Sequence, residues 1–530
     1  MAHLLESFLA STPRPLLLLL AALSILPVAG STKHRFYPDD PIAKEPPPIS
    51  VGELRIDTHT DAGAMVEETL HQPGKNADTL SRTNRAPALD INTIDEVPDS
   101  DWYTNRHDLH PLTNSELALG PGGNAPPTVN QPWTIVAANE GMTPIFRIQD
   151  SSGRAFALRF DPKGYPERTT GADVAGSHIL HAIGYNVPDN YAVRFDRRQL
   201  RIGSNIRYLR DGQRVTLRES DVDHLLSLVT RYPDGTWRAL ASRLVDGELL
   251  GPFSYAGTRD DDPNDIFPHD HRRVLRALFV FSAWLDHADT RTLGTLDTIQ
   301  SIDGIRRVRH FLTDFGSSFG SASLRPDEAW EGHTYAVDLR WGLRELLTLG
   351  AYSPKWERTH PRILPGAGRF VSDTFDPAAW KPTYPNPAFD NRTVADCFWA
   401  AKQIKAFTDD QLAALVRSGQ YSDPKTVDAI VHTLVIRRDK IAAYYFAKTL
   451  PLDGFEVREG TLGYRDLGGN GHYSVVWSRY DNDTDKKSPL DVPSTLAVPR
   501  IAGYLAADIG DGSHQLTVYV HDGRVVGVTR

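Results

Sequence analysis

With 530 residues, the chain is longer than a single hydrophobic core usually supports, so two or three folded units are expected. Hydrophobic residues make up 40% and charged residues 24%, a globular composition that excludes a wholly disordered chain. The net charge is −9 and no basic stripe is present, so a nucleic-acid partner is not expected. Cys397 is the only cysteine, which excludes an intramolecular disulfide and a metal cluster held by thiolates.

The N-terminal segment has the pattern of a secretion signal. Arg14 precedes an apolar run over residues 16–26, whose length fits the core of a signal peptide and falls short of the roughly 20 residues that span a bilayer. Small residues follow, ahead of a predicted cleavage site before Ser31. Residues 1–30 are therefore predicted to direct export to the periplasm or the cell exterior, with no membrane span after cleavage. An uncleaved membrane anchor is the alternative.

The next part of the chain divides into an arm and a strand-rich region. Residues 31–125 are rich in Pro, Asp and Asn and lack periodicity, which predicts an extended arm or linker. A predicted helix begins at Thr169 or Thr170 and ends at Gly184. Strands are predicted around this helix at residues 133–138, 144–149, 154–160, 191–195 and 200–202.

Helical periodicity appears after about residue 265. Buried helices are predicted at residues 274–285 and from Pro424 to about residue 445. From about residue 455 the pattern is strand-like again, and an Asp522-Gly523 turn predicts a hairpin over residues 516–528. The chain is thus predicted to be α+β, with a C-terminal β-rich domain at 455–530.

Two short stretches carry the residues suited to catalysis. Trp-Leu-Asp-His-Ala-Asp, which ends at Asp289, closes the first buried helix, and Asp314-Phe315-Gly316 follows a predicted hairpin over residues 295–313. A hairpin returns the chain to its starting end, so it is expected to bring Asp289 and Asp314 together. Phosphoryl transfer needs such a pair, because one carboxylate orients the attacking hydroxyl and another holds magnesium.

These stretches resemble the protein-kinase superfamily, with His287-Ala288-Asp289 in the place of the kinase H-R-D motif and residues 314–316 in the place of D-F-G. More broadly, the chain resembles an uncharacterised family of exported bacterial kinase-like proteins and, distantly, the HipA-type and spore-coat-protein kinases. The resemblance implies a bilobal core, with a small lobe at 126–255 and a helical large lobe at 265–450. It also implies Mg²⁺ and ATP as cofactors.

The same resemblance assigns site residues. Asp289 takes the place of the catalytic base and Asp314 that of a magnesium ligand. Arg159 stands where kinases carry the phosphate-binding lysine, and Asp173 where they carry its glutamate partner. Arginine keeps the charge and grips phosphate with two donors, but it is not interchangeable with lysine.

Other positions depart further from the kinase pattern. Gly294 replaces the metal-binding asparagine and has no oxygen ligand to offer, unless Asp297 substitutes for it. Lys163, four residues beyond Arg159, is a second candidate for the missing ammonium group, and residues 138–141 supply only one glycine for a phosphate lid. Two hypotheses follow: a weak ATP-dependent phosphotransferase, or a degenerate pseudokinase that binds nucleotide. A protein or cell-surface molecule is the expected acceptor or partner.

The histidines suggest a different function, a metal-dependent phosphohydrolase. His269, Asp270 and His271 together with residues 286–289 offer nitrogen and oxygen ligands, and residues 57–61 add another cluster. However, His269 and His271 are two positions apart and would diverge on a helix, unlike the i, i+4 pairs of metal hydrolases. Surface loop histidines are therefore the preferred interpretation.

Overall fold

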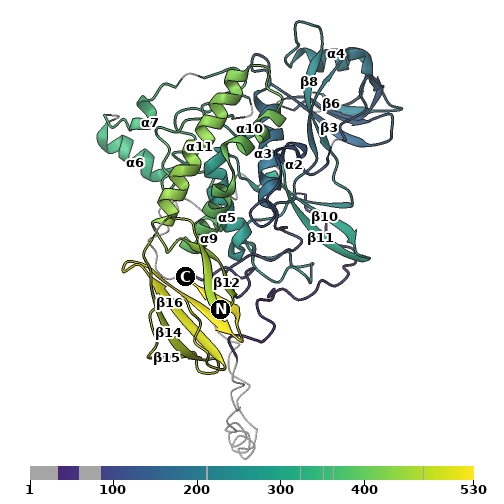
Figure 1. The fold of residues 1–530 in the computed structure, drawn as a ribbon. Coiled ribbons are helices and arrows are strands. Elements are labelled where there is room, and N and C mark those ends of the chain that lie inside the picture. The colour runs from purple at the N-terminus through teal and green to yellow at the C-terminus, as the bar shows by residue number, and fades with distance from the viewer. Residues whose placement is uncertain are drawn as a thin grey trace, which may run out of the picture.

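The computed structural model describes residues 34–58 and 85–530, apart from positions 124, 142, 211, 212, 323, 350, 362 and 470. Within these residues the protein is a mixed α+β structure, as predicted (Figure 1). The predicted signal peptide and residues 59–84 of the predicted arm lie outside the described residues. In the described ranges no helix has both the length and the apolar character needed to cross a bilayer.

The first folded part is built on a six-stranded sheet in the order β4-β8-β3-β2-β1-β5. Its strands are β1 (Trp133–Asn139), β2 (Ile145–Gln149), β3 (Ala155–Phe160), β4 (Asn190–Phe195), β5 (Leu200–Ile202) and β8 (Trp237–Arg243). In β3 the alternate residues Phe156, Leu158 and Phe160 are buried in the core of this sheet. Because side chains alternate along a strand, Arg159 projects from the opposite face.

Helix α3 (Arg168–Ile183) packs between this sheet and the helical part of the molecule, and nearly all of its residues are buried. It begins one or two residues before the predicted start, since Thr170 is already inside the helix and donates its hydroxyl to Asp161. The predicted end at Gly184 is confirmed. This glycine has a φ of 142°, and a Cβ there would lie 2.2 Å from the ring of Tyr103.

The helical part is centred on α5 (Arg273–Leu285), all of whose residues are buried. It packs against α9 and α11, and Asp423 caps the first turn of α11 at the predicted position. The remaining α-helices of the described chain surround these elements or decorate the sheets. The bounds are α2 (Asn114–Leu119), α4 (Glu219–Ser227), α6 (Leu339–Thr348), α7 (Lys355–Arg358), α8 (Pro387–Asp390), α9 (Val394–Ala406), α10 (Asp409–Ser418) and α11 (Pro424–Phe446).

The predicted hairpin between the two motif stretches is present. Strands β10 (Thr295–Ile302) and β11 (Ile305–Leu312) pair in register from Thr295 opposite Leu312 to Ile302 opposite Ile305. Strand β9 (Glu248–Gly251) adds to β10 and completes a three-stranded sheet. Strands β6 (Arg207–Arg210) and β7 (Gln213–Thr216) form a separate small hairpin.

The C-terminal part is strand-rich. Its main sheet has the order β15-β14-β16-β17-β18, and β12 pairs with β13 beside it. The bounds are β12 (Leu452–Arg458), β13 (Thr461–Asp466), β14 (Ser474–Asp481), β15 (Lys486–Pro489), β16 (Tyr504–Gly510), β17 (Gln515–His521) and β18 (Arg524–Thr529). The hairpin predicted around Asp522 and Gly523 is β17–β18, and both turn residues have the positive φ that such a turn requires.

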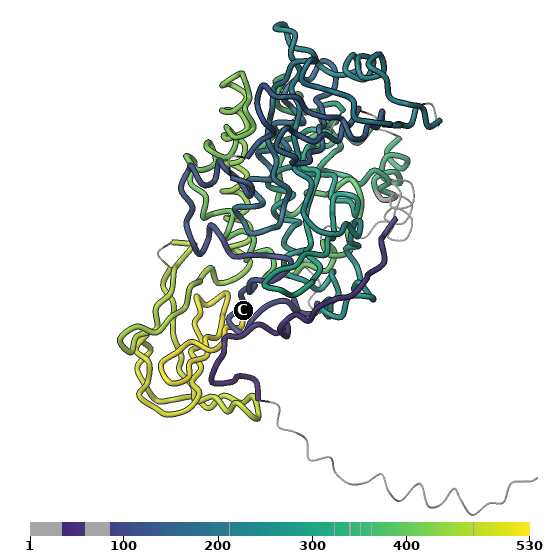
Figure 2. Tube along the Cα trace, turned by 90° about the vertical axis from the view of Figure 1, so that its right-hand side faces the viewer, coloured from purple at the N-terminus to yellow at the C-terminus, as the bar shows by residue number. Residues whose placement is uncertain are grey.

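The described part of the N-terminal segment runs over these units as an extended chain (Figure 2). Phe36 packs among the rings of Tyr480, Tyr504 and Tyr519 of the C-terminal sheet. It fills the space above Gly527, where a Cβ would lie 2.2 Å from the phenyl ring. Further along, Val51 packs into the apolar cluster on the β9–β10–β11 sheet. The segment therefore bridges two sheets that are distant in sequence.

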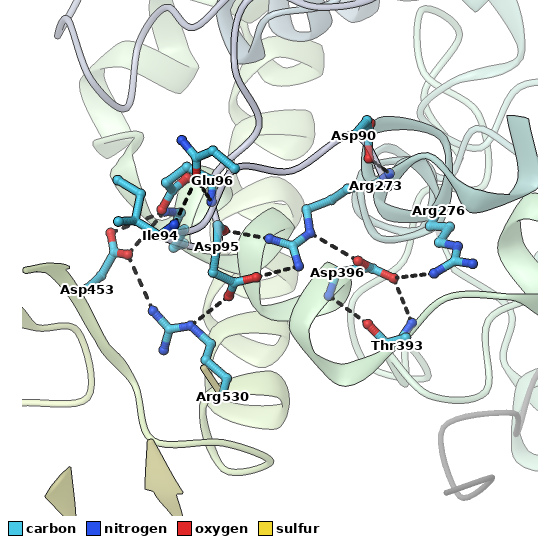
Figure 3. A network of polar contacts seen from close by, with 12 residues as sticks. Asp90, Ile94, Asp95, Glu96, Arg273, Arg276, Thr393, Asp396, Asp453 and Arg530 are labelled. Atoms are coloured by element: carbon cyan, nitrogen blue, oxygen red, sulfur yellow. Dashed lines mark hydrogen bonds and ion pairs between the residues drawn. The ribbon is translucent and has the colours of Figure 1, made fainter. Parts of the chain in front are cut away.

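A buried polar network joins three parts of the chain (Figure 3). Asp396 of α9 accepts a hydrogen bond from the Nε of Arg273 at 3.0 Å and lies 3.6 Å from Arg276 Nη1. Arg273 also donates to Asp95, which in turn pairs with the C-terminal Arg530. The helical part, the segment before α2 and the end of β18 are thus linked through charged groups.

Candidate functional site

Arg159 meets Asp314 at the junction between the six-stranded sheet and the β10–β11 hairpin. Arg159 Nη1 lies 3.1 Å from Asp314 Oδ1, and the two side chains are 37% and 51% exposed. The carboxylate beside it raises the pKa of Arg159. Since exposed ion pairs contribute only about 0.2–1 kcal/mol, this contact is weak enough for a charged ligand to replace it.

Asp314 is held in an unusual backbone conformation. It follows β11 with φ 63° and ψ 64°, in the left-handed region, and the next residues form the 3₁₀ turn η4 (Phe315–Ser317). Phe315 is buried in the helical core and lies against Gly176 of α3. The apolar anchor of Phe315 leaves the preceding carboxylate at the surface, facing Arg159.

Asp173 supports this turn from α3. Its buried carboxylate accepts hydrogen bonds from the backbone N–H groups of Phe315 and Gly316, and Asn190 Nδ2 donates to its Oδ1 at 2.8 Å. A Cβ on Gly316 would lie 2.6 Å from Thr169 Cγ2, so the close approach of the turn to α3 requires glycine. The expected ion pair between Arg159 and Asp173 is not formed, because Arg159 pairs with Asp314 instead. Asp173 acts on Arg159 only at longer range.

Burial raises the pKa of Asp173 to about 7, and the neighbouring Asp314 raises it further, against the opposing effect of Arg159. The folded protein therefore keeps a proton that the unfolded chain loses at about pH 4. Stability from this group is complete below pH 4 and is lost as the pH rises to about 7.

We expect Asp173→Asn to flatten the pH dependence of stability in this window. Asn carries no charge to bury, so the loss of stability between about pH 4 and pH 7, on the order of a few kcal/mol, should be reduced. Melting temperatures of both proteins between pH 4.5 and pH 8.5 check this. Parallel curves for the two proteins would contradict it.

Asp289 lies in the loop after α5, where Arg291 grips its carboxylate. Arg291 donates from Nε to Oδ1 and from Nη2 to Oδ2, the latter at 2.8 Å. His287, two residues earlier, is buried and shares a hydrogen bond of 2.8 Å with Ser317 Oγ, directly after the Asp314 turn. Burial lowers the pKa of His287, while both Asp289 and Asp314 act in the opposite direction. The two carboxylates therefore act on one histidine from the same end of the hairpin, although 25 positions separate them.

Gly294 closes the loop between these carboxylates. Its carbonyl accepts a hydrogen bond of 2.8 Å from the N–H of Thr313, the residue before Asp314. A Cβ on Gly294 would lie 3.4 Å from the Thr313 carbonyl and 3.9 Å from the Asp289 carbonyl, ordinary contact distances. A cavity lined by residues of this loop has about 250 Å³. Small-molecule pockets usually have roughly 300–1,000 Å³, so a larger ligand would lie on the open side, by Arg159 and Asp314.

Two residues suggested by the sequence lie away from this group. Asp297 is buried inside β10 and pairs with His310 Nδ1 at 2.7 Å, while Arg259 lies 3.6 Å from its other oxygen. Because the chain does not turn at position 297 but continues as a strand, its carboxylate is directed to His310. Lys163 is exposed in the loop between β3 and α3 and lines a different groove with Asp223.

The histidines expected to be surface loop residues are not all exposed. His269 is buried and bonded to Asp265 through Nε2 at 2.7 Å, whereas His271 is partly exposed. Among the residues that the structure describes, no three His, Cys, Asp or Glu side chains are grouped to hold a metal ion. Asp57 lies at the end of a described range, and residues 59–61 of the same proposed cluster lie outside it. The structure therefore gives the phosphohydrolase hypothesis no metal centre in the described chain.

Three site residues escaped the sequence analysis: Arg291, Asn190 and Ser317. Arg291 had a detectable signal, since an arginine two positions after a catalytic-type aspartate in a loop is well placed to bind it. Asn190 and Ser317 had no such signal, because their partners come from other elements.

No protein-family model matches the chain, and no curated protein matches it. Among solved structures, it is similar to the crystal structure of a Helicobacter pylori proinflammatory kinase, CtkA. The identity is 11%, the TM-score is 0.30, and the match covers 58% of this chain and 93% of that chain. The neighbour is a kinase, but a likeness this weak does not establish a shared fold. None of these findings supports the narrower families that the motifs resemble.

Proposed function

We propose that the chain is a kinase-like, nucleotide-binding protein whose ligand lies between β3 and the turn after β11. The observation that carries the proposal is the convergence of Arg159 and Asp314 from separate folded parts, with Asp173 behind the turn. In this proposal the six-stranded sheet and the helical part correspond to the two lobes of a kinase. Export by the predicted signal peptide remains part of the proposal.

Arg159 would bind the phosphates of the nucleotide. Its guanidinium is partly exposed, stays charged at any physiological pH, and offers planar donors that suit phosphate oxygens. Its present partner is the carboxylate of Asp314, so an incoming polyphosphate would compete for the arginine.

The donor set fits a magnesium ion that arrives with the nucleotide. Mg²⁺ is often held by one or two carboxylates plus substrate phosphates, and Asp314 supplies one half-exposed carboxylate. Gly294 supplies no second oxygen, and the Asp297 carboxylate is engaged elsewhere. When bound, such an ion would neutralise charge on the phosphates.

Asp289 decides between phosphotransferase and scaffold. Its carboxylate is 32% exposed, and Arg291 occupies both of its oxygens. In an active enzyme, Asp289 would accept or orient the proton of the acceptor hydroxyl, and Arg291 would fix its position. A carboxylate held in this way is also a weaker base, which favours slow transfer or binding alone.

Melting in the presence of Mg-ATP tests the proposal. At 100 times the dissociation constant, a ligand that binds only the folded state stabilises it by about 2.7 kcal/mol. We expect a rise in melting temperature for the wild type and none for Asp314→Asn. The exposed pair of Glu248 and Arg306 provides a matched control, in which Glu248→Gln should keep the rise. An unchanged melting temperature for the wild type would refute nucleotide binding.

Transfer of radiolabel from ATP separates the two forms of the proposal. Labelling of the protein or of an added acceptor that disappears with Asp289→Ala would show a phosphotransferase. Nucleotide binding without labelling would identify a pseudokinase.

A further inference from the structure

Helix α6 (Leu339–Thr348) exposes its apolar side. Leu343, Leu346 and Leu347, spaced at i, i+3 and i+4, are 56%, 69% and 75% exposed, and Leu349 just beyond the helix is 91% exposed. Residues at this spacing lie on one face of a helix. In a globular protein this face normally points to the core, so the orientation of α6 is inverted.

The other side of α6 attaches it to the protein. Trp341 packs against the rings of Tyr352 and Trp356 at 5.8 Å and 5.2 Å, and Trp356 stacks on His333 at 5.0 Å. Both α6 and α7 lie at the margin of the molecule, away from the C-terminal sheet (Figure 1). The aromatic contacts therefore fix the helix with its leucines directed outward.

The surroundings of this face are basic although the protein is acidic. Residues 337–363 contain five basic and three acidic residues, a net charge of +2, in a chain with a net charge of −9. One of the acidic residues, Asp338, is neutralised by Lys381 at 2.7 Å. Arg344 is exposed, and its guanidinium lies over the ring of Tyr352 at 4.8 Å.

We propose that α6 binds the surface of a lipid bilayer that contains anionic lipid. A helix with leucines on one face, flanking arginine and nearby tryptophan or tyrosine lies in the membrane interface, with its apolar face among the acyl chains. Basic side chains near the surface add attraction to anionic headgroups. A planar bilayer accepts a protruding helix without a matching groove, and its charge complements the basic residues around α6. Surface binding by α6 is independent of the nucleotide site.

Co-sedimentation with vesicles tests this proposal. The full-length chain is mixed with vesicles of phosphatidylcholine alone or with phosphatidylglycerol. We expect binding to the anionic vesicles, at least tenfold weaker binding for the double variant Leu346→Glu/Leu347→Glu, and weaker binding in high salt for the wild type. Arg344→Glu should weaken binding to anionic vesicles while leaving the leucine face intact.

A charge-matched control uses exposed leucines elsewhere. Leu109 and Leu209 are 52% and 51% exposed, and the double variant Leu109→Glu/Leu209→Glu should bind like the wild type. The apolar run at residues 16–26 is the same in all these proteins, so a difference between them reports on α6. Equal binding of the wild type and the Leu346/Leu347 variant would overturn the proposal. So would a wild-type dimer, seen by light scattering, that dissociates in that variant, because the face would then bind a second copy.

Discussion

Asp396→Asn should lower the free energy of unfolding by about 3–5 kcal/mol, the usual cost of removing one partner from a buried ion pair. Arg273 and Arg276 are 2% and 1% exposed, and both lie within ion-pair distance of the Asp396 carboxylate (Figure 3). Asn keeps an oxygen that can accept the hydrogen bond from the N–H of Thr393 at the start of α9, so the cap of the helix is retained. The expected loss therefore comes from two buried arginines deprived of a negative charge.

Urea unfolding followed by tryptophan fluorescence measures this effect. Lys405 and Asp439 form an exposed pair, with side chains 44% and 49% exposed, and provide the comparison. Lys405→Ala should change stability by less than about 1 kcal/mol. A loss of similar size for Asp396→Asn would show that the network does not stabilise the fold.

Gly294→Asn should increase the affinity for Mg-ATP about tenfold or more, equivalent to at least about 1.4 kcal/mol. The position has room for a side chain, since a Cβ would make only ordinary contacts with Thr313 and Asp289. The new amide oxygen would be placed in the loop between Asp289 and Asp314, where the protein offers no second neutral oxygen ligand. Oxygen donors of this kind suit Mg²⁺.

Gly294→Ala is the matched control, because it adds the Cβ without the oxygen. We expect its affinity for Mg-ATP to equal that of the wild type, and we expect both variants to bind magnesium-free ATP alike. Competition against a fluorescent ATP analogue gives the affinities. If Asn and Ala have the same effect, the missing asparagine is not what limits this site.

The local structure around the site could be predicted from the sequence. The Asp303-Gly304 turn and the flanking alternating residues define the β10–β11 hairpin, and the pairing of Thr295 with Leu312 follows from its length. That hairpin is what brings the loops of Asp289 and Asp314 to one end. The alternation of β3 likewise separates Arg159 from the buried phenylalanines.

Partners contributed by distant elements could not be predicted. The sequence pattern places Arg159 on a strand and Asp173 on a helix, but it does not say that Arg159 would pair with Asp314. That choice depends on how closely the η4 turn packs on α3, which in turn depends on glycine at position 316. For the same reason, the burial of Asp297 against His310 was missed.

The path of the N-terminal segment was also hidden. Residues 34–58 have no periodicity, and the stacking of Phe36 on three tyrosines depends on a space that Gly527 leaves in a sheet almost 500 positions away. Composition indicated an extended chain, whereas its docking sites depend on the tertiary structure of both sheets.

Isothermal titration of the protein with Mg-ATP tests the central claim most directly, that Arg159 and Asp314 face one nucleotide site. The account predicts saturable heat with one site per chain, at least tenfold weaker binding for Arg159→Met, and loss of the magnesium dependence for Asp314→Asn. Binding that neither substitution changes, or no binding by the wild type, would contradict it.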